Sequence, residues 1–182
     1  MRRRTWHLSF GTMLFALAAF AQQPDAVTDD EIKAALAGVS QHASRIEPML
    51  RQLNPADWVA KGAPQTYVKQ WNAALSAIGS IRIDMTNLAQ RPDQMPEELK
   101  ALFRIGSYHE GLRSLMGAVR RYQNPALADL IESVAAEDQG DIDRMQQYVT
   151  ELAAEKDRQL DLMNEEAQRC RGLLSKQPVK PK

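Results

Sequence analysis

The sequence predicts an all-α protein: an up-and-down four-helix bundle with left-handed heptad packing, whose long last helix either projects or is broken. Apolar residues recur at alternating steps of three and four through most of the 182-residue chain. This is the spacing of a seam between packed helices. Capping residues and prolines divide the pattern into four segments. The chain has one cysteine, so no internal disulfide can form and core packing must hold the fold.

The first helix is expected to begin after Thr28. Thr28 and Glu31 form the capping-box sequence Thr-x-x-Glu, which satisfies two amide groups at a helix start. Pro48 lies within the apolar pattern and lacks an amide hydrogen, so it should kink this helix or end it early. The seam consists of Ile32, Leu36, Val39, Ala43, Ile46, Leu50 and Leu53.

Residues 54–64 are expected to form the longest ordered loop, because this stretch holds Pro55, Gly62 and Pro64. Trp58 lies in the middle of it. A large aromatic side chain in a long loop usually packs the loop onto the end of a bundle, and we expect Trp58 to do this. The alternative is an exposed Trp58 that anchors a binding partner.

The second helix is predicted to start near Pro64 and to end at Arg91, and the third to start near Pro96 and to have about 25 residues. Pro64 and Pro96 suit the first turn of a helix. Pro92 ends the second helix, because the residue before a proline avoids the α region. The two seams consist of Tyr67, Trp71, Ala74, Ile78, Ile81, Met85 and Leu88, and of Leu102, Ile105, His109, Leu112, Met116 and Val119.

The fourth pattern starts at the capping pair Asn124-Pro125 and continues to Arg171. Two consecutive steps of four residues meet at Asp138, and such a stutter locally unwinds a supercoil. The helix therefore either projects beyond the bundle or breaks near Gly140 and doubles back. Its second half is highly charged and keeps a thin apolar stripe. The stripe consists of Leu160, Met163, Ala167, Cys170 and Leu174.

The N-terminus has the order of a secretory signal peptide, predicted to cover residues 1–21. Three arginines precede an apolar run, and Ala19 and Ala21 place small residues at the −3 and −1 positions of a cleavage site. The apolar run is short for a membrane span, which needs about 20 residues. The alternative is an uncleaved anchor. With cleavage after Ala21, the protein is exported, either periplasmic or secreted, and contacts the membrane only transiently.

Cleavage leaves a short N-terminal lead (22–27), a single helical-bundle domain (28–175) and a tail (176–182) expected to be disordered. Lysine and arginine together balance aspartate and glutamate at 23 each. Loss of the three signal-peptide arginines makes the mature chain slightly acidic. This composition argues against nucleic acid or an anionic membrane surface as the partner.

The sequence has none of the motifs that mark common catalytic or cofactor sites, such as a haem-attachment Cys-x-x-Cys-His, a phosphate loop or a nucleophile elbow. We therefore expect no enzyme activity, no catalytic residue, no metal and no cofactor. One constellation stands apart from this expectation. His42, His109 and Asp138 lie at similar heights on three predicted helices. They form a possible mid-bundle polar layer that could ligate a haem or metal. The alternative is a half-exposed His42, with His109 bonded in the core or turned toward a loop.

Cys170 is a free thiol between two arginines, which favour its thiolate form. It is interpreted as a tolerated, half-buried helix residue; the alternatives are an intermolecular disulfide or a reactive thiol. The expected function is that of a non-enzymatic interaction or scaffold protein of the cell envelope, with a protein partner or self-association through the C-terminal helix. The alternatives are a periplasmic chaperone-like client binder and a haem or metal carrier that uses the polar layer.

Overall fold

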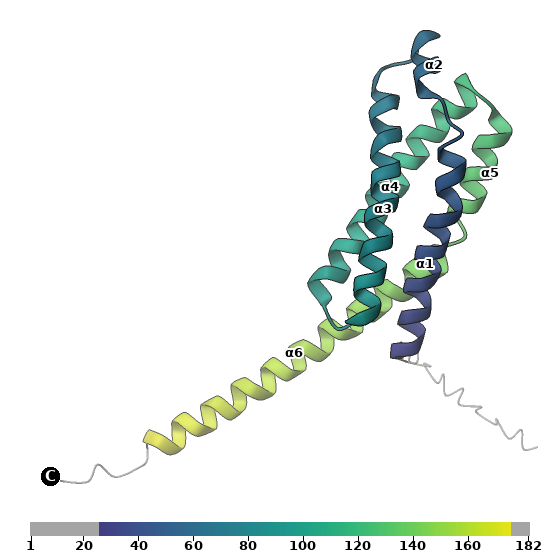
Figure 1. Ribbon diagram of the computed structural model, residues 1–182. Helices are drawn as coiled ribbons and strands as arrows, with labels where there is room; N and C mark the ends of the chain where they lie inside the picture. Colours follow the sequence, from purple (N-terminus) through teal and green to yellow (C-terminus); the bar gives the residue numbers. More distant parts are fainter. Residues whose placement is uncertain (1–25, 176–182) are drawn as a thin grey trace, which may run out of the picture.

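The computed structural model describes residues 26–175, and all regular secondary structure in this range is helical (Figure 1). The predicted signal peptide, residues 22–25 of the lead and the tail 176–182 lie outside the described residues. The helices are α1 (Asp29–Leu50), α2 (Pro55–Ala60), α3 (Thr66–Gln90), α4 (Met95–Tyr122), α5 (Pro125–Ala135) and α6 (Gln139–Ser175).

The predicted helix starts are confirmed where the sequence supplied a cap. At the start of α1, the Thr28 hydroxyl accepts a hydrogen bond from the Glu31 amide at 3.3 Å, and the Glu31 carboxylate accepts one from the Thr28 amide at 2.8 Å. The Asn124 side chain accepts from the Ala126 amide at 2.9 Å and caps α5. Pro48 does end its helix early, since α1 stops two residues later.

The expected loop at 54–64 contains the short helix α2, so the prediction of an irregular segment there is wrong. Pro55 at its first position supplies the helical φ angle that starts the turn. Trp58 is confirmed as a plug, with 1% of its surface exposed. Its indole Nε1 donates to Oε1 of Gln123 at 3.1 Å, and the Gln123 amide donates to the Gln52 carbonyl at 3.2 Å. The loop is thereby fastened to the end of α4.

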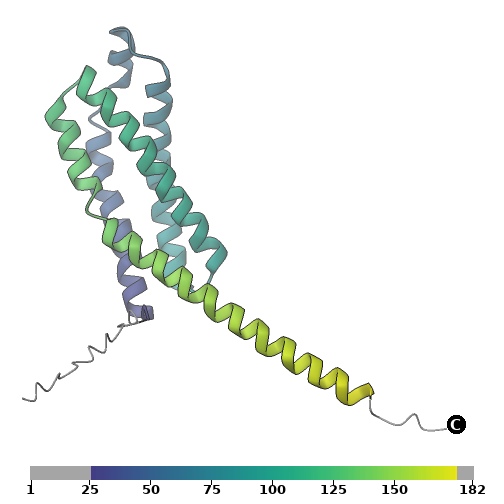
Figure 2. The same ribbon diagram turned by 180° about the vertical axis from the view of Figure 1, so that it is seen from behind.

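The helices pack side by side around one core (Figures 1 and 2). α1 contacts α3, α5 and α6, while α4 contacts α3, α5 and α6. The predicted seams supply the core. On α4 the buried face is wider than the predicted seam, because α3, α5 and α6 all pack against this helix. The largest fully buried side chains are Trp58, Ile32, Leu36, Ile46, Leu50, Ile78, Met85, Ile105, Leu115, Met116, Ile131 and Met145.

The fourth predicted helix is broken between Ala135 and Gln139, at the predicted stutter. It does not double back. α6 packs against α1 and α4 and then leaves the bundle as a straight extension (Figure 2). Gly38 of α1 lies directly against Asp141 of α6. A Cβ atom at this position would collide with the Asp141 carboxylate. Within residues 26–175, no helix has the length and apolarity needed to cross a membrane.

Candidate functional site

The structure brings the three residues of the predicted polar layer together. His42 comes from α1, His109 from α4, and Asp138 from the break just before α6. The Asp138 Oδ2 atom lies 3.8 Å from His42 Nε2 and 3.3 Å from His109 Nε2. His42 and Asp138 are 3% and 4% exposed, so the layer is inside the bundle. The prediction of a half-exposed His42 as the alternative is therefore wrong.

The surroundings of His42 favour its neutral form. The Arg45 guanidinium lies 3.3 Å from Nδ1 and can only donate, so this ring nitrogen is the acceptor. The proton of the neutral ring is then on Nε2, directed at Asp138. At 3.8 Å the contact is electrostatic, because it is too long for a hydrogen bond. Burial lowers the pKa of His42; the Asp138 charge opposes this shift and the Arg45 charge reinforces it.

Of the three residues in the polar layer, His109 is the most exposed to solvent. Its side chain is 22% exposed and forms part of a pocket of about 350 Å³ between α4 and α5 that also includes Arg113, Glu132 and Gln139. Glu132 pairs with Arg120 at 2.6 Å on the rim. Part of the His109 imidazole is thus open to solvent, whereas the His42 side chain is buried.

Asp138 begins α6, because its carbonyl accepts the Ile142 amide at 3.0 Å. The positive end of the helix dipole therefore supports its carboxylate charge. Its charge and, above all, burial raise the pKa of Tyr108, which stays a neutral phenol. No set of three or more His, Cys, Asp or Glu side chains in the described range is placed to hold a metal ion.

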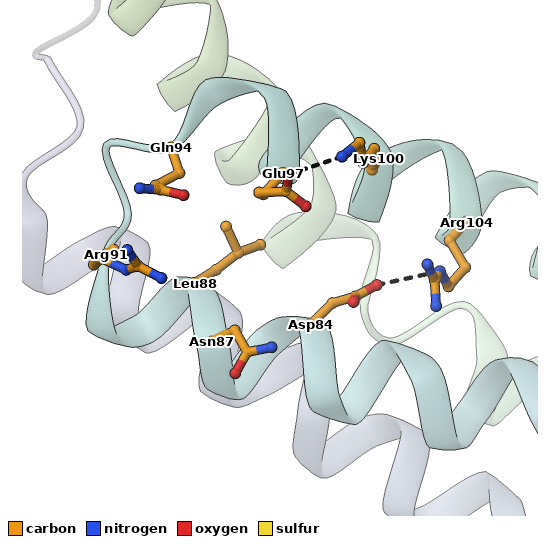
Figure 3. Close-up of a pocket in the computed structure, with 8 residues that line it drawn as sticks. All are labelled: Asp84, Asn87, Leu88, Arg91, Gln94, Glu97, Lys100 and Arg104. Carbon is orange, nitrogen blue, oxygen red and sulfur yellow. Dashed lines mark hydrogen bonds and ion pairs between the residues drawn. The ribbon is translucent and has the colours of Figure 1, made fainter.

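A second hollow, of about 410 Å³, lies where α3 ends and α4 begins (Figure 3). Its charged side chains are mostly paired with each other. Lys100 contacts Glu97 at 2.7 Å, and Arg104 contacts Asp84 at 3.2 Å. Arg91 makes no ion pair with any residue that the structure describes. A single unpaired cation on an open surface gives this pocket no defined ligand.

The most distinctive surface is the C-terminal arm, which we define as residues 154–175 of α6. Every side chain from Ala154 to Leu173 is exposed. The predicted stripe is present on it, with Leu160 57% and Met163 65% exposed. Large apolar side chains at helical spacing on an isolated helix are typical of a helix-binding face.

Cys170 lies on this arm and is exposed. The interpretation as a half-buried residue is wrong, because no other helix within residues 26–175 lies beside the arm to cover it. It remains a free thiol, since the chain has no second cysteine.

Sequence reasoning missed Glu98, which is completely buried in the first turn of α4. Neither carboxylate oxygen has a hydrogen-bond partner in the described chain. Burial raises its pKa to about 7. A signal existed, because Glu98 precedes Leu102 by four residues and Ile105 by seven, which places it on the core face.

No protein-family model matches the sequence, and no match is found among the curated proteins or the solved structures.

Proposed function

We propose that the protein is an exported, non-enzymatic interaction module of the cell envelope, which binds a protein through its C-terminal arm. One observation carries the proposal: the arm presents an apolar stripe to solvent over several helical turns. An isolated helix gains little stability from propensity alone, and most helices are stabilised by packing of an apolar face. A partner helix would supply that packing.

We further propose that the described helices form an up-and-down four-helix bundle with left-handed packing, in which α5 and the first half of α6 together make the fourth member. The pairwise contacts support this arrangement. α3 contacts both α1 and α4, while α5 and α6 each contact both α1 and α4. The alternating three- and four-residue seams favour the left-handed crossing. The bundle then serves as a rigid base for the arm.

Two other functions make different demands on the same chain. A chaperone-like client binder would use the stripe without sequence preference and would suppress aggregation of unrelated unfolded proteins. A haem or metal carrier would use His42, His109 and Asp138, and protein purified from its native host would be coloured or contain metal. The binding of one dominant partner through the stripe distinguishes our proposal from both.

The test compares two leucines of the arm. Leu160 lies on the stripe and Leu162 lies beside it, and the two are 57% and 62% exposed. The tagged wild type, Leu160→Glu with Met163→Glu, and the control Leu162→Glu are cross-linked in the envelope fraction of the native host. We expect the stripe variant to lose the dominant cross-linked protein and the control to keep it. Equal capture by all three would overturn the proposal.

Export is tested separately by the intact mass of protein from the same fraction. We expect a chain that begins at Gln22, because cleavage follows Ala21. A mass that includes Arg2 to Arg4 would instead identify an uncleaved, anchored protein.

A further inference from the structure

Building on the proposed function, we propose that the partner of the C-terminal arm is a second copy of the same arm, bound antiparallel about a two-fold axis near Glu165. The first four residues of the stripe have the symmetry that such a pairing needs. Leu160, Met163, Ala167 and Cys170 follow steps of three, four and three residues. This order reads the same in both directions about residue 165.

Antiparallel pairing about this point alternates large and small side chains. Leu160 lies opposite the partner's Cys170, and Met163 lies opposite the partner's Ala167. Each layer then has a similar width, which is what close packing of two helices requires. A parallel pairing would instead stack Leu on Leu and Ala on Ala, so neighbouring layers would differ in width.

The charges beside the stripe are complementary in the same register. Asp157 and Arg171 make no ion pair in the described chain. By contrast, Arg158 pairs with Glu155 at 2.7 Å and Arg169 pairs with Glu165 at 3.6 Å within the arm. Asp157 and Arg171 are also the flanking positions that face each other across an antiparallel seam. The dimer therefore gains two Asp157–Arg171 pairs, and such flanking pairs set the orientation of coiled coils.

Repulsion between like charges of the two arms is weaker in the antiparallel dimer than in the parallel one. On the other edge of the antiparallel dimer, Glu166 faces the partner's Glu166, at an exposed position where screening is strong. Lys156 continues the seam in either orientation. In a parallel dimer it faces the partner's Lys156, which places two like charges in the core, whereas in the antiparallel dimer it lies level with the partner's Leu174. Antiparallel helix dipoles add a small favourable contribution.

The orientation is tested by cross-linking the full mature chain with a short bismaleimide. In the antiparallel dimer the two Cys170 thiols are ten residues apart along the axis, about 15 Å at 1.5 Å per residue, and do not react together. Asn164 faces the partner's Asn164. We therefore expect Asn164→Cys, in a Cys170→Ser background, to give a covalent dimer and the wild type to give none. The reverse pattern identifies a parallel dimer and overturns the proposal.

The register is tested by charge reversal, with sedimentation velocity as the measurement. Asp157→Arg turns both ion pairs into repulsive pairs and should weaken the dimer roughly tenfold. Adding Arg171→Asp restores both pairs with reversed polarity, and the double variant should regain the wild-type affinity. The control is Asp161→Arg, which lies away from the seam and should leave the affinity unchanged. If the double variant binds no more tightly than Asp157→Arg alone, the register is wrong.

The failure of this inference can be distinguished from the failure of the proposed function. If the wild type is monomeric at every concentration while the stripe variant loses a different cross-linked protein, the self-pairing is overturned and the arm binds another partner. If the chain neither dimerises nor loses a partner on stripe substitution, both proposals fail. Far-ultraviolet circular dichroism of each variant checks that the helices are retained.

Discussion

Buried ionisable side chains without full hydrogen bonding are the residues in this protein whose substitution has the clearest expected effect. Glu98 is enclosed at the start of α4 and has no hydrogen-bond partner among the described residues. Burial raises its pKa from 4.5 to about 7. The folded state therefore binds this proton more tightly than the unfolded state does, and the free energy of unfolding falls as pH rises from 4.5 through 7.

Glu98→Gln should consequently stabilise the protein at pH 8 by about 1 to 3 kcal/mol, because the variant has no charge to desolvate. The upper figure follows from the pKa shift, and the positive end of the α4 dipole reduces it. The gain should vanish below pH 4.5, where the wild-type carboxyl is protonated in both states. Urea unfolding at the two pH values measures it. The control Glu97→Gln removes an exposed neighbour and should change stability little; equal gains from both would contradict the assignment.

His42 has the opposite pH dependence. Its pKa lies below 6.5 because burial disfavours the imidazolium, so the unfolded chain takes up this proton first. Its contribution to stability is therefore fully present above 6.5 and is lost as pH falls from 6.5 through the lower pKa of the folded state. Titration of the ring by NMR should give a pKa below 6.5. Arg45→Met removes the cation 3.3 Å from Nδ1 and should raise that pKa. A wild-type value at or above 6.5 would show that the Asp138 charge outweighs burial.

At the scale of the element, α3 offers a direct comparison between its two faces. Ile78 is completely buried and Ile83 is 62% exposed, and both lie within the same helix. Ile78→Asp should cost more than about 3 kcal/mol, because an unpaired carboxylate would have to be buried or neutralised. Ile83→Asp should stay within about 0.5 kcal/mol. Thermal melting of the two variants measures the difference, and similar melting temperatures would mean that the seam of α3 is misplaced.

The same helix-scale rules explain what the sequence could predict. Long periodic seams and strong caps placed α1, α3 and α4 within a few residues, because each signal is local. The stutter at Asp138 marked where the regular spacing changes, but it left open whether the helix continues or breaks there. The short helix α2 was missed because six residues are too few to show a period. The position of α2 is fixed by Trp58, which donates a hydrogen bond to Gln123, a residue 65 positions further along the chain.

The candidate site, too, could be predicted from the sequence only in part. The similar heights of His42, His109 and Asp138 could be counted from the predicted helix starts. Their convergence on one carboxylate oxygen could not, because it depends on how the break turns the chain. The exposure of Cys170 was missed for a related reason. A stripe on a helix predicts a buried face, yet only the tertiary arrangement shows whether another helix covers it.

For the whole molecule, the bundle and the arm should be separable. Among the side chains that the structure describes, the last buried one is Val149, and the backbone of Val27 is held to Glu151 by a 2.9 Å hydrogen bond. Deletion of residues 156–182 removes neither. The truncated chain should therefore unfold cooperatively, with a melting temperature within about 3 °C of the full chain. Calorimetry at matched, low concentration measures this. Loss of the cooperative transition would mean that the arm is part of the core.

The arm is a continuation of a helix that already packs in the bundle, and this has a consequence for binding. α6 has 37 residues in one uninterrupted helix, about 55 Å at 1.5 Å per residue. Its direction is set where it contacts α1 and α4, not by a flexible hinge. A disordered segment that folds on binding loses conformational entropy in that step. Here the part of α6 that packs in the bundle already provides the helix nucleus from which the arm extends, so binding has to order less of the chain than it would in a disordered segment.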